Sequence, residues 1–446
     1  MRVQAPDTTL PPIPVAPIIR ILRPFQAFAE NKMAGGVLLL VCTATALLWA
    51  NSPWASYYAT LWHTNLSFGL AGRTLSYDLH FWVNDLLMAV FFFVVGLEIK
   101  REVLVGELAS VQKAALPIAG ALGGVVVPAL IYASLNAGGP GAAGWGIPMA
   151  TDIAFALGVM TLLGNRVPFG LKVFLTALAI VDDIAAVIVI AIFYTARIDW
   201  TLLGGAALCL AALFFLGRFG ARKPLTYAVG GAILWLLVLG SGVHATIAGV
   251  ALAFVVPARR RLRFRDFVLW SRTVLARAER SSHPEGSLMA NEDQQAALHA
   301  LEQACENVQP PLHRMEHALH PWVTFLIMPV FALANAGVPL SGDMGSTLSE
   351  PITLGVILGL LLGKPVGITL ASWIAVRSGV AALPAGTTWL RLHAAGWLGG
   401  IGFTMSLFIA GLAFQDEAML NLAKVGILSA SLFAGIIGSA ILFRRG

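Results

Sequence analysis

Charged residues are scarce in this chain. Of its 446 residues, only 12% are Asp, Glu, Lys or Arg, and 58% are hydrophobic, whereas soluble domains carry about 25% charged residues. Apolar runs of about 20 residues recur along the sequence, and each is long enough to cross a bilayer. The low charge therefore excludes a soluble globular enzyme and predicts an all-α membrane protein that crosses the bilayer many times.

Cysteine is also rare. Cys42, Cys209 and Cys305 lie far apart and no CxxC pair occurs, so we expect neither a disulfide nor a structural zinc ion. The first 20 residues, "MRVQAPDTTLPPIPVAPIIR", are rich in proline and lack an apolar h-region. They are typical of a flexible tail and not of a cleavable signal peptide.

Hydropathy predicts about twelve transmembrane helices. They lie near 34–52, 79–99, 114–136, 146–163, 169–194, 200–217, 224–240, 243–256, 318–337, 352–376, 391–413 and 421–443. Residues 18–32 are predicted to form a short amphipathic helix on the membrane surface. The predicted parts are a cytoplasmic tail with this helix (1–32), helices one to eight (33–257), a cytoplasmic insertion (258–315) and helices nine to twelve (316–446).

The distribution of basic residues predicts the orientation. One set of alternate loops, with the two chain ends, holds Arg20, Arg23, Lys32, Lys100, Arg101, Lys113, Arg166, Lys172, Arg218, Arg222, Lys223, Arg377, Arg391, Arg444 and Arg445. The other set holds only Arg73, Arg197 and Lys424. By the positive-inside rule both termini are cytoplasmic, which agrees with an even number of spans. The net charge of +6 is thus a topology signal, and we expect no nucleic-acid partner.

The insertion at 258–315 has two parts. It opens with "ARRRLRFRD", which the anionic leaflet of a membrane attracts. A polar stretch with helical character, "NEDQQAALHALEQACENVQ", follows at 291–309. The simplest interpretation of the whole segment is a solvated loop.

Four ionisable residues lie deep inside predicted spans. Asp182 and Asp183 are adjacent in "AIVDDIAAV", Lys364 lies in "LGLLLGKPVGI", and Asp152 lies in "PMATDIAFALG". A carboxylate at the centre of a membrane helix costs about 2.5–3.5 kcal/mol on insertion scales. Ionisable residues at this depth pair with one another or line an aqueous route, and they mark ion or proton pathways by default.

The aspartate pair has two interpretations. A plain ion pair with Lys364 would lock two helices together, but one lysine neutralises only one carboxylate, and neighbouring residues of a helix point about 100° apart. The other carboxylate needs a proton or a metal cation. Carboxylate oxygens suit hard cations, and burial beside a like charge favours the protonated form of a carboxyl group. The pair is therefore predicted to be a site at which a small cation and protons compete.

Two predicted spans contain helix-breaking residues. In span four, Gly144, Gly146 and Pro148 precede Thr151 and Asp152; span eleven has glycines at 396, 399, 400 and 402. Such residues interrupt helices, and freed backbone groups are tolerated at membrane depth only inside protein or a cavity. Asp152 and Lys364 would balance the exposed helix ends. Close packing through small residues is the alternative.

Both interruptions lie in the second helix of a set of three, spans three to five and ten to twelve, and the two sets run in opposite directions. Interrupted segments in corresponding positions of inverted repeats point to the substrate site of a secondary transporter.

With these residues assembled, the chain closely resembles the NhaA-type sodium/proton antiporters of bacterial inner membranes. The matching stretches are "NDLLMAVFFFVVGLEIKRE" (84–102), "ATDIAFALG" (150–158), "LTALAIVDDIAAVIVIAIFYT" (175–195), "SGVHATIAGV" (241–250), "LHPWVTFLIMPVFALANAGV" (319–338), "LGKPVGI" (362–368) and "GIGFTMSLFI" (400–409).

The resemblance implies twelve helices, with the fourth and eleventh unwound where they cross. It implies that Asp182 and Asp183 bind sodium or lithium and carry protons, beside Thr151 and Asp152. Lys364 would pair with Asp182 or balance the crossed helix ends. Exchange would move two protons per sodium ion, be electrogenic and be activated at alkaline pH, with no cofactor.

The resemblance also assigns peripheral roles. It implies a pH response at the cytoplasmic side involving Glu98, Glu102, Glu316 and His317, with His244 at a further pH-linked position. Other implied features are an outer-side passage at Asp85 and a homodimer with an outward β-hairpin at residues 62–77. The tail and the 258–315 insertion are longer than this family's pattern.

Other function classes fit less well. "HRMEH" at 313–317 matches the H-x-x-E-H zinc-protease pattern, but five-residue motifs recur by chance and no distal glutamate ligand is evident. An intramembrane aspartyl protease needs aspartates from two facing helices, whereas Asp182 and Asp183 are neighbours on one. A channel can use acidic residues for selectivity, but inverted interrupted repeats with a midplane lysine favour alternating access.

Overall fold

The computed structural model describes residues 34–70, 73–195, 198–280, 292–339 and 344–444, so the amphipathic helix predicted at 18–32 lies outside the described residues. In these ranges, eight helices are long and apolar enough to cross a membrane. They are Leu79–Val105, α6 (Val111–Asn136), α8 (Phe169–Phe193), α9 (Trp200–Arg218), α10 (Pro224–Ser241), Pro311–Asn335, Pro351–Arg377 and α21 (Glu417–Arg444). The predicted class, a helical protein with many apolar spans, is confirmed.

Three further apolar helix pairs are bent at short breaks. These are α2 (Ala34–Ala50) with α3 (Ala55–Trp62) at 116°, the 3-10 helix Pro140–Met149 with α7 (Ile153–Leu162) at 41°, and α19 (Trp389–Gly399) with α20 (Phe403–Ala413) at 45°. Counting each pair as one span gives up to eleven spans in the described chain. The eighth predicted span coincides with α11 (Thr246–Val255), whose 10 residues are fewer than the about 20 that cross a bilayer.

Three of the long helices are continuous but change pitch. Leu79–Val105 joins α4 (Leu79–Phe81) and α5 (Met88–Val105) through a π-helical turn, Trp82–Leu87. In the same way, Val323–Ile327 joins α14 (Pro311–Trp322) to α15 (Met328–Asn335), and Gly359–Gly363 joins α17 (Pro351–Leu358) to α18 (Lys364–Arg377). The last of these turns places Lys364 at the start of α18, midway along its span.

Helices α6 and α18 cross where each has a glycine, so their backbones lie in direct contact. A Cβ atom on Gly123 would lie 2.1 Å from the carbonyl oxygen of Gly367, and one on Gly367 would lie 2.2 Å from that of Gly123. Only glycine permits this approach. One turn away, a Cβ on Gly363 would lie 2.7 Å from the Cα of Pro128. The crossing therefore fixes the position of the residue that follows, Lys364.

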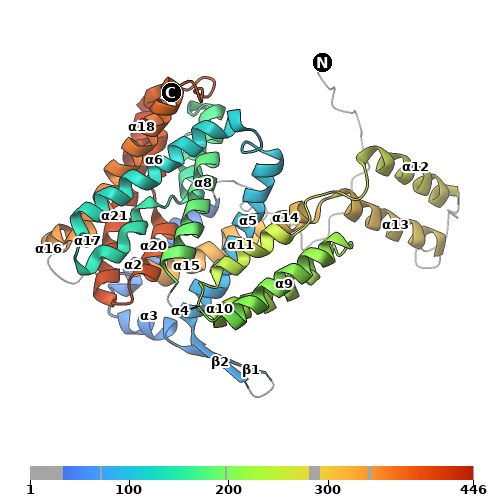
Figure 1. The fold of residues 1–446 in the computed structure, drawn as a ribbon, viewed down its shortest axis with the longest axis horizontal. Helices are drawn as coiled ribbons and strands as arrows, with labels where there is room; N and C mark the ends of the chain where they lie inside the picture. The colour runs from blue at the N-terminus through green and yellow to red at the C-terminus, as the bar shows by residue number, and fades with distance from the viewer. Residues whose placement is uncertain (1–33, 71–72, 196–197, 281–291, 340–343, 445–446) are drawn as a thin grey trace.

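The remaining elements lie at the periphery (Figure 1). Strands β1 (Asn65–Leu70) and β2 (Arg73–Asp78) pair antiparallel, with Asn65 opposite Asp78. Within the predicted insertion, α12 (Phe264–Arg280) and α13 (Glu292–Val308) lie side by side, away from the bundle. A short helix, α16 (Met344–Ser349), precedes α17. Helix α14 begins at Pro311, so the end of the segment assigned to the insertion is helical and continues into the ninth predicted span.

Candidate functional site

The two interrupted helices meet at their interruptions. Residues 150–152 separate the 3-10 helix from α7, and residues 400–402 separate α19 from α20. The backbone N–H of Asp152 donates a 2.7 Å hydrogen bond to the carbonyl of Ile401. As the glycines and the proline predict, both helices are broken, and this bond joins one break to the other. The amino-terminal ends of α7 and α20 consequently lie together.

Asp152 binds both of these helix ends. Its Oδ1 accepts a 3.0 Å hydrogen bond from the backbone N–H of Phe155, in the first turn of α7. Its Oδ2 accepts one of 3.1 Å from the backbone N–H of Thr404, in the first turn of α20, and another from the Thr404 hydroxyl. The carboxylate thus faces two partly positive helix ends. These contacts fit the charge-compensating role predicted for Asp152 better than that of a free cation ligand.

Asp182 and Lys364 form a buried ion pair. Both side chains are closed to solvent, and Lys364 Nζ donates to Asp182 Oδ2. The hydroxyl of Thr151 lies 2.7 Å from the same oxygen and 2.8 Å from the carbonyl oxygen of Gly399. Asp182 Oδ1 has no hydrogen-bond partner in the part of the chain that the structure describes. Asp182 is therefore held on one side and has a free oxygen on the other.

Asp183, the next residue of α8, has a different environment. Its side chain is 3% exposed, and no group in the described ranges forms a hydrogen bond or an ion pair with it. Removing a charged carboxylate from water without a partner is costly. The arrangement therefore fits a carboxylate that holds a proton or a cation, as the sequence predicted for one member of the pair.

Arg101 organises three of the predicted pH-response residues. Its guanidinium lies 3.0 Å from Glu102, 3.1 Å from Glu316 and 3.9 Å from Glu98. Glu316 comes from α14 and is buried, while Glu98, Arg101 and Glu102 come from α5. The cluster therefore links the end of α5 to the start of the ninth predicted span.

The predicted histidines lie apart from this cluster. His317 is exposed and stacks on His313 with ring centroids 6.3 Å apart. His244 contacts Phe408 of α20 edge to face at 5.8 Å, and its Nδ1 lies 3.2 Å from the Thr246 hydroxyl. The structure brings the three glutamates together around Arg101, while His317, the next residue after Glu316, is exposed and His244 contacts α20.

Asp85 lies in the π-helical turn Trp82–Leu87. It is half-buried, and its Oδ1 is buried without a hydrogen-bond partner among the residues described. A buried carboxylate oxygen without a partner among the described residues fits a point on a polar route.

Two contributors were missed by the sequence reasoning. The sequence identifies Arg101 only as a topology signal, although its position between Glu98 and Glu102 in one helical turn indicates a charge cluster. Thr404 lies two residues after Gly402, in the first turn of α20, where the helix restarts. Lys100, which precedes Arg101 in the chain, donates to the carbonyls of Phe254 (2.6 Å) and Val256 (2.5 Å) at the end of α11.

The zinc-protease pattern at 313–317 does not form a ligand set. In the ranges that the structure covers, no three His, Cys, Asp or Glu side chains gather closely enough to hold a metal ion. Glu316 of the pattern is engaged with Arg101.

Comparison with known proteins identifies the family of the chain. The family model described as "Na+/H+ antiporter 1" matches residues 26–442. A relative from Koribacter versatilis, "Na(+)/H(+) antiporter NhaA", is 51% identical over 429 residues, covering 96% of this chain and 93% of its own. One of the same name from Oleidesulfovibrio alaskensis is 50% identical over 422 residues, covering 95% and 94%. The chain belongs to the Na+/H+ antiporter 1 family.

Proposed function

We propose that this chain expels sodium or lithium ions in exchange for protons, two per sodium ion, by alternating access at the Asp182–Asp183 pair. The family membership makes it a secondary antiporter and not an enzyme. The observation that carries the proposed mechanism is the contrast between the two aspartates: Asp182 is paired with Lys364, whereas Asp183 has no partner among the described residues.

Sodium is proposed to bind where Asp182 Oδ1 and the Asp183 carboxylate are unpartnered. Carboxylate, hydroxyl and carbonyl oxygens suit a hard cation, and the Thr151 hydroxyl lies next to Asp182. A sodium ion held by both carboxylates weakens the Lys364–Asp182 ion pair, because sodium and the Lys364 ammonium compete for the Asp182 carboxylate. Entry of the cation therefore opposes both the protonated form of Asp183 and the Lys364–Asp182 pair.

The proposed stoichiometry assigns one released proton to Asp183 and one to Lys364. Without sodium, Asp183 holds one proton and Lys364 holds a second as an ammonium paired with Asp182. With sodium bound between the two carboxylates, Lys364 loses its partner, and burial disfavours an unpaired ammonium. The site then changes from neutral, with the ammonium, one carboxylate and protonated Asp183, to one net negative charge, with sodium, two carboxylates and a neutral amine. Two protons leave as one sodium ion binds, so exchange is electrogenic.

The crossing of α7 and α20 is proposed to change shape as access alternates. The two interrupted helices are joined by the Asp152–Ile401 backbone bond, the contacts of the Asp152 carboxylate and the hydroxyls of Thr151 and Ser406, which lie 2.8 Å from the carbonyl oxygens of Gly399 and Ile147. Because these contacts involve both helices, one helix does not shift without affecting the other.

The alkaline activation is proposed to start at the Arg101 cluster, where a single guanidinium holds Glu98, Glu102 and Glu316. A change in these contacts would change how α5 and α14 are held together. His244, which contacts Phe408 of α20, and His317, which is exposed on α14, are proposed to contribute separately to the pH response. Asp85 is proposed to lie on the outer passage.

The remaining assignments rest on the resemblance. We propose twelve spans with inverted repeats at spans three to five and ten to twelve, both termini in the cytoplasm, and location in a bacterial inner membrane. The strand pair β1–β2 is proposed to lie on the outer side at the contact of a homodimer. The insertion that includes α12 and α13 is proposed to be cytoplasmic.

A liposome assay tests the exchange. The protein is reconstituted with a pH-sensitive dye inside, and sodium or lithium is added under an imposed gradient at pH 7 to 9. We expect proton movement for the wild type, at least 100-fold less for Asp183→Asn, and an unchanged rate for Asp293→Asn, whose carboxylate is exposed on α13. No proton movement by the wild type would refute the proposed function. A full rate and sodium affinity in Asp183→Asn would refute the site.

A further inference from the structure

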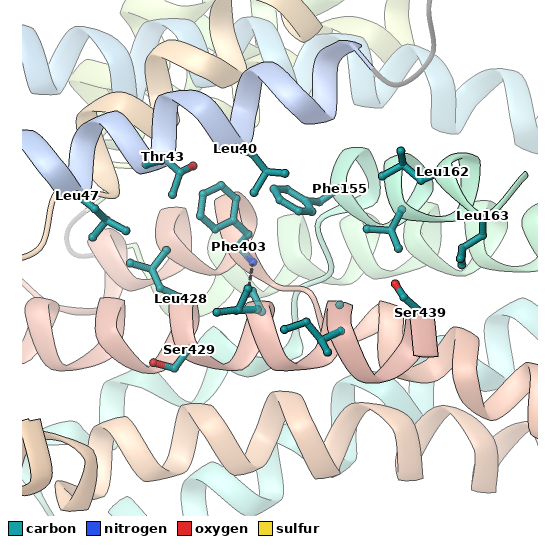
Figure 2. A pocket seen from close by; sticks show the side chains of 16 residues that line it. Leu40, Thr43, Leu47, Phe155, Leu162, Leu163, Phe403, Leu428, Ser429 and Ser439 are labelled. Carbon is teal, nitrogen blue, oxygen red and sulfur yellow. Dashed lines mark hydrogen bonds between the residues drawn. The ribbon is translucent and has the colours of Figure 1, made fainter. Parts of the chain in front are cut away.

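A hollow of about 780 Å³ lies between α2, α7, α20 and α21. Its lining is almost entirely apolar, and of its four polar side chains Thr43 and Ser431 already form hydrogen bonds inside the protein. Figure 2 shows the side chains of Leu40, Phe155 and Phe403 in the space between α2 and α21. The volume lies within the about 300–1,000 Å³ of small-ligand sites.

The hollow extends to the crossing of α7 and α20. The rings of Phe155 and Phe403 contact each other there, with centroids 5.4 Å apart. Phe155 is in the first turn of α7 and its N–H binds Asp152. Phe403 is the first residue of α20, and its N–H donates to the Ser431 hydroxyl at 3.1 Å. Any occupant of the hollow therefore contacts the two helix ends that Asp152 joins.

One end of the hollow is basic. Leu163 and Ser439 line it and also line a smaller adjoining hollow that ends at Phe443 and Arg444. The guanidinium of Arg166 lies over the Phe443 ring, 3.8 Å from its centroid, a cation–π contact. An apolar groove thus ends at two cations.

We infer that this groove binds one anionic phospholipid, with an acyl chain against Phe155 and Phe403 and the phosphate at Arg166 and Arg444. Helices α2 and α21 present exposed apolar side chains around the groove, among them Leu40 and Ile436, so bilayer lipid has direct access to it. Basic pockets between transmembrane helices are typical sites for anionic headgroups. A neutral apolar ligand would make no use of the two arginines.

The bound lipid packs against the crossing of α7 and α20. An apolar space without contents forfeits the dispersion contacts of its lining, and an acyl chain restores them for both phenylalanine rings. The bound lipid is therefore expected to stabilise the arrangement of α7 and α20.

The first test measures lipid binding to the detergent-purified protein by native mass spectrometry. Phosphatidylglycerol and phosphatidylcholine with the same acyl chains are compared. We expect phosphatidylglycerol to bind at least tenfold more tightly and to raise the thermal unfolding midpoint more. Gly435→Leu fills the groove, where the nearest atom to a new Cβ is Ile401 Cδ1 at 3.6 Å, and is expected to lose this binding. Gly204→Leu on α9, with no atom within 4 Å, is the matched control and is expected to keep it.

The second test separates the headgroup from the chain. In Arg166→Ala/Arg444→Ala the preference for phosphatidylglycerol is expected to fall below twofold, while Arg377→Ala, at the end of α18, keeps it. Equal binding of the two lipids by the wild type would overturn the proposal, as would wild-type binding in Gly435→Leu. Because the readout is bound lipid, these outcomes do not depend on whether the chain exchanges sodium for protons.

Discussion

At the residue scale, the buried Lys364–Asp182 ion pair makes a direct prediction for the stability of the protein. Lys364→Met leaves a buried carboxylate without its partner, and breaking such a pair costs about 3–5 kcal/mol. The double variant Asp182→Asn/Lys364→Met removes both charges and is expected to regain most of that loss. The thermal unfolding midpoint of the purified protein measures both. A double variant no more stable than Lys364→Met would show that the pair is not what holds these helices.

Asp152 permits a second test at this scale, because one carboxylate caps two helices. Loss of a capping side chain costs about 0.5–2 kcal/mol per helix end, so Asp152→Ala is expected to lose about twice the effect of a single cap. Thr404→Val removes one hydroxyl and keeps the N–H bond to Asp152, and its unfolding midpoint is expected to fall less. Equal losses in the two variants would contradict the double cap.

The charged site residues were predictable because they are chemically out of place. Asp152, Asp182, Asp183 and Lys364 are conspicuous in apolar runs, so their cost alone points to them. The partners of Arg101 and Thr404 were not predictable in the same way. Glu316 and Asp152 lie more than 200 residues away from them in the chain, and only the packing of helices shows these contacts.

At the scale of elements, the α6–α18 crossing is a strict constraint. A Cβ on Gly123 lies 2.1 Å from the Gly367 carbonyl oxygen, so Gly123→Ala is expected to push the helices apart. Such overpacking typically costs about 1–3 kcal/mol, and it displaces Lys364, which starts α18. We expect a lower unfolding midpoint together with at least tenfold slower sodium-dependent proton movement in liposomes. Gly204→Ala on α9 is the control; an equal effect there would contradict the special role of the crossing.

The α12–α13 pair is expected to be dispensable for exchange. Its base is closed by the N–H groups of Arg261 and Leu262, which both donate to the carbonyl of Asn307 at 3.1 and 3.2 Å. Replacing residues 264–306 with a short glycine–serine linker keeps this base. The transport rate in liposomes is expected to stay within twofold of the wild type. A tenfold loss would assign the insertion a part in the transport cycle itself.

The elements themselves were largely predictable, since hydropathy and helix breakers act locally. The interruptions before α7 and before α20 follow from glycine and proline. The extent of the helices was less predictable: the 3-10 helix begins at Pro140 instead of 146, and α14 begins at Pro311 instead of 318. In both cases a proline at the first helical position, where it is favoured, lies outside the most apolar window.

At the scale of the whole molecule, composition and charge predict the order of the spans along the chain, but they do not predict which spans pack against each other. The contact of α6 with α18, and of the α7 end with the α20 end, joins segments about 240 residues apart in the chain. The surfaces at which α6 and α18 meet are apolar or glycine-rich, and so are most other surfaces here. The crossing of the fourth and eleventh spans is implied by the family resemblance alone. Hydropathy therefore gives no reason to prefer one pairing over another.

At the same scale, the β1–β2 ribbon is expected to form the contact of the proposed dimer. Strands β1 and β2 form a two-stranded ribbon with Ser67 and Ser76 hydroxyls 2.7 Å apart, and the edge of a sheet is a general template for pairing with another chain. Replacing residues 67–76 with two glycines keeps Asp78, which caps the next helix through the Phe81 N–H. We expect the dimer fraction in native mass spectrometry to fall at least tenfold, whereas Ser67→Ala/Ser76→Ala, which keeps the strands, stays dimeric. A shortened chain that remains dimeric would place the contact on the helices instead.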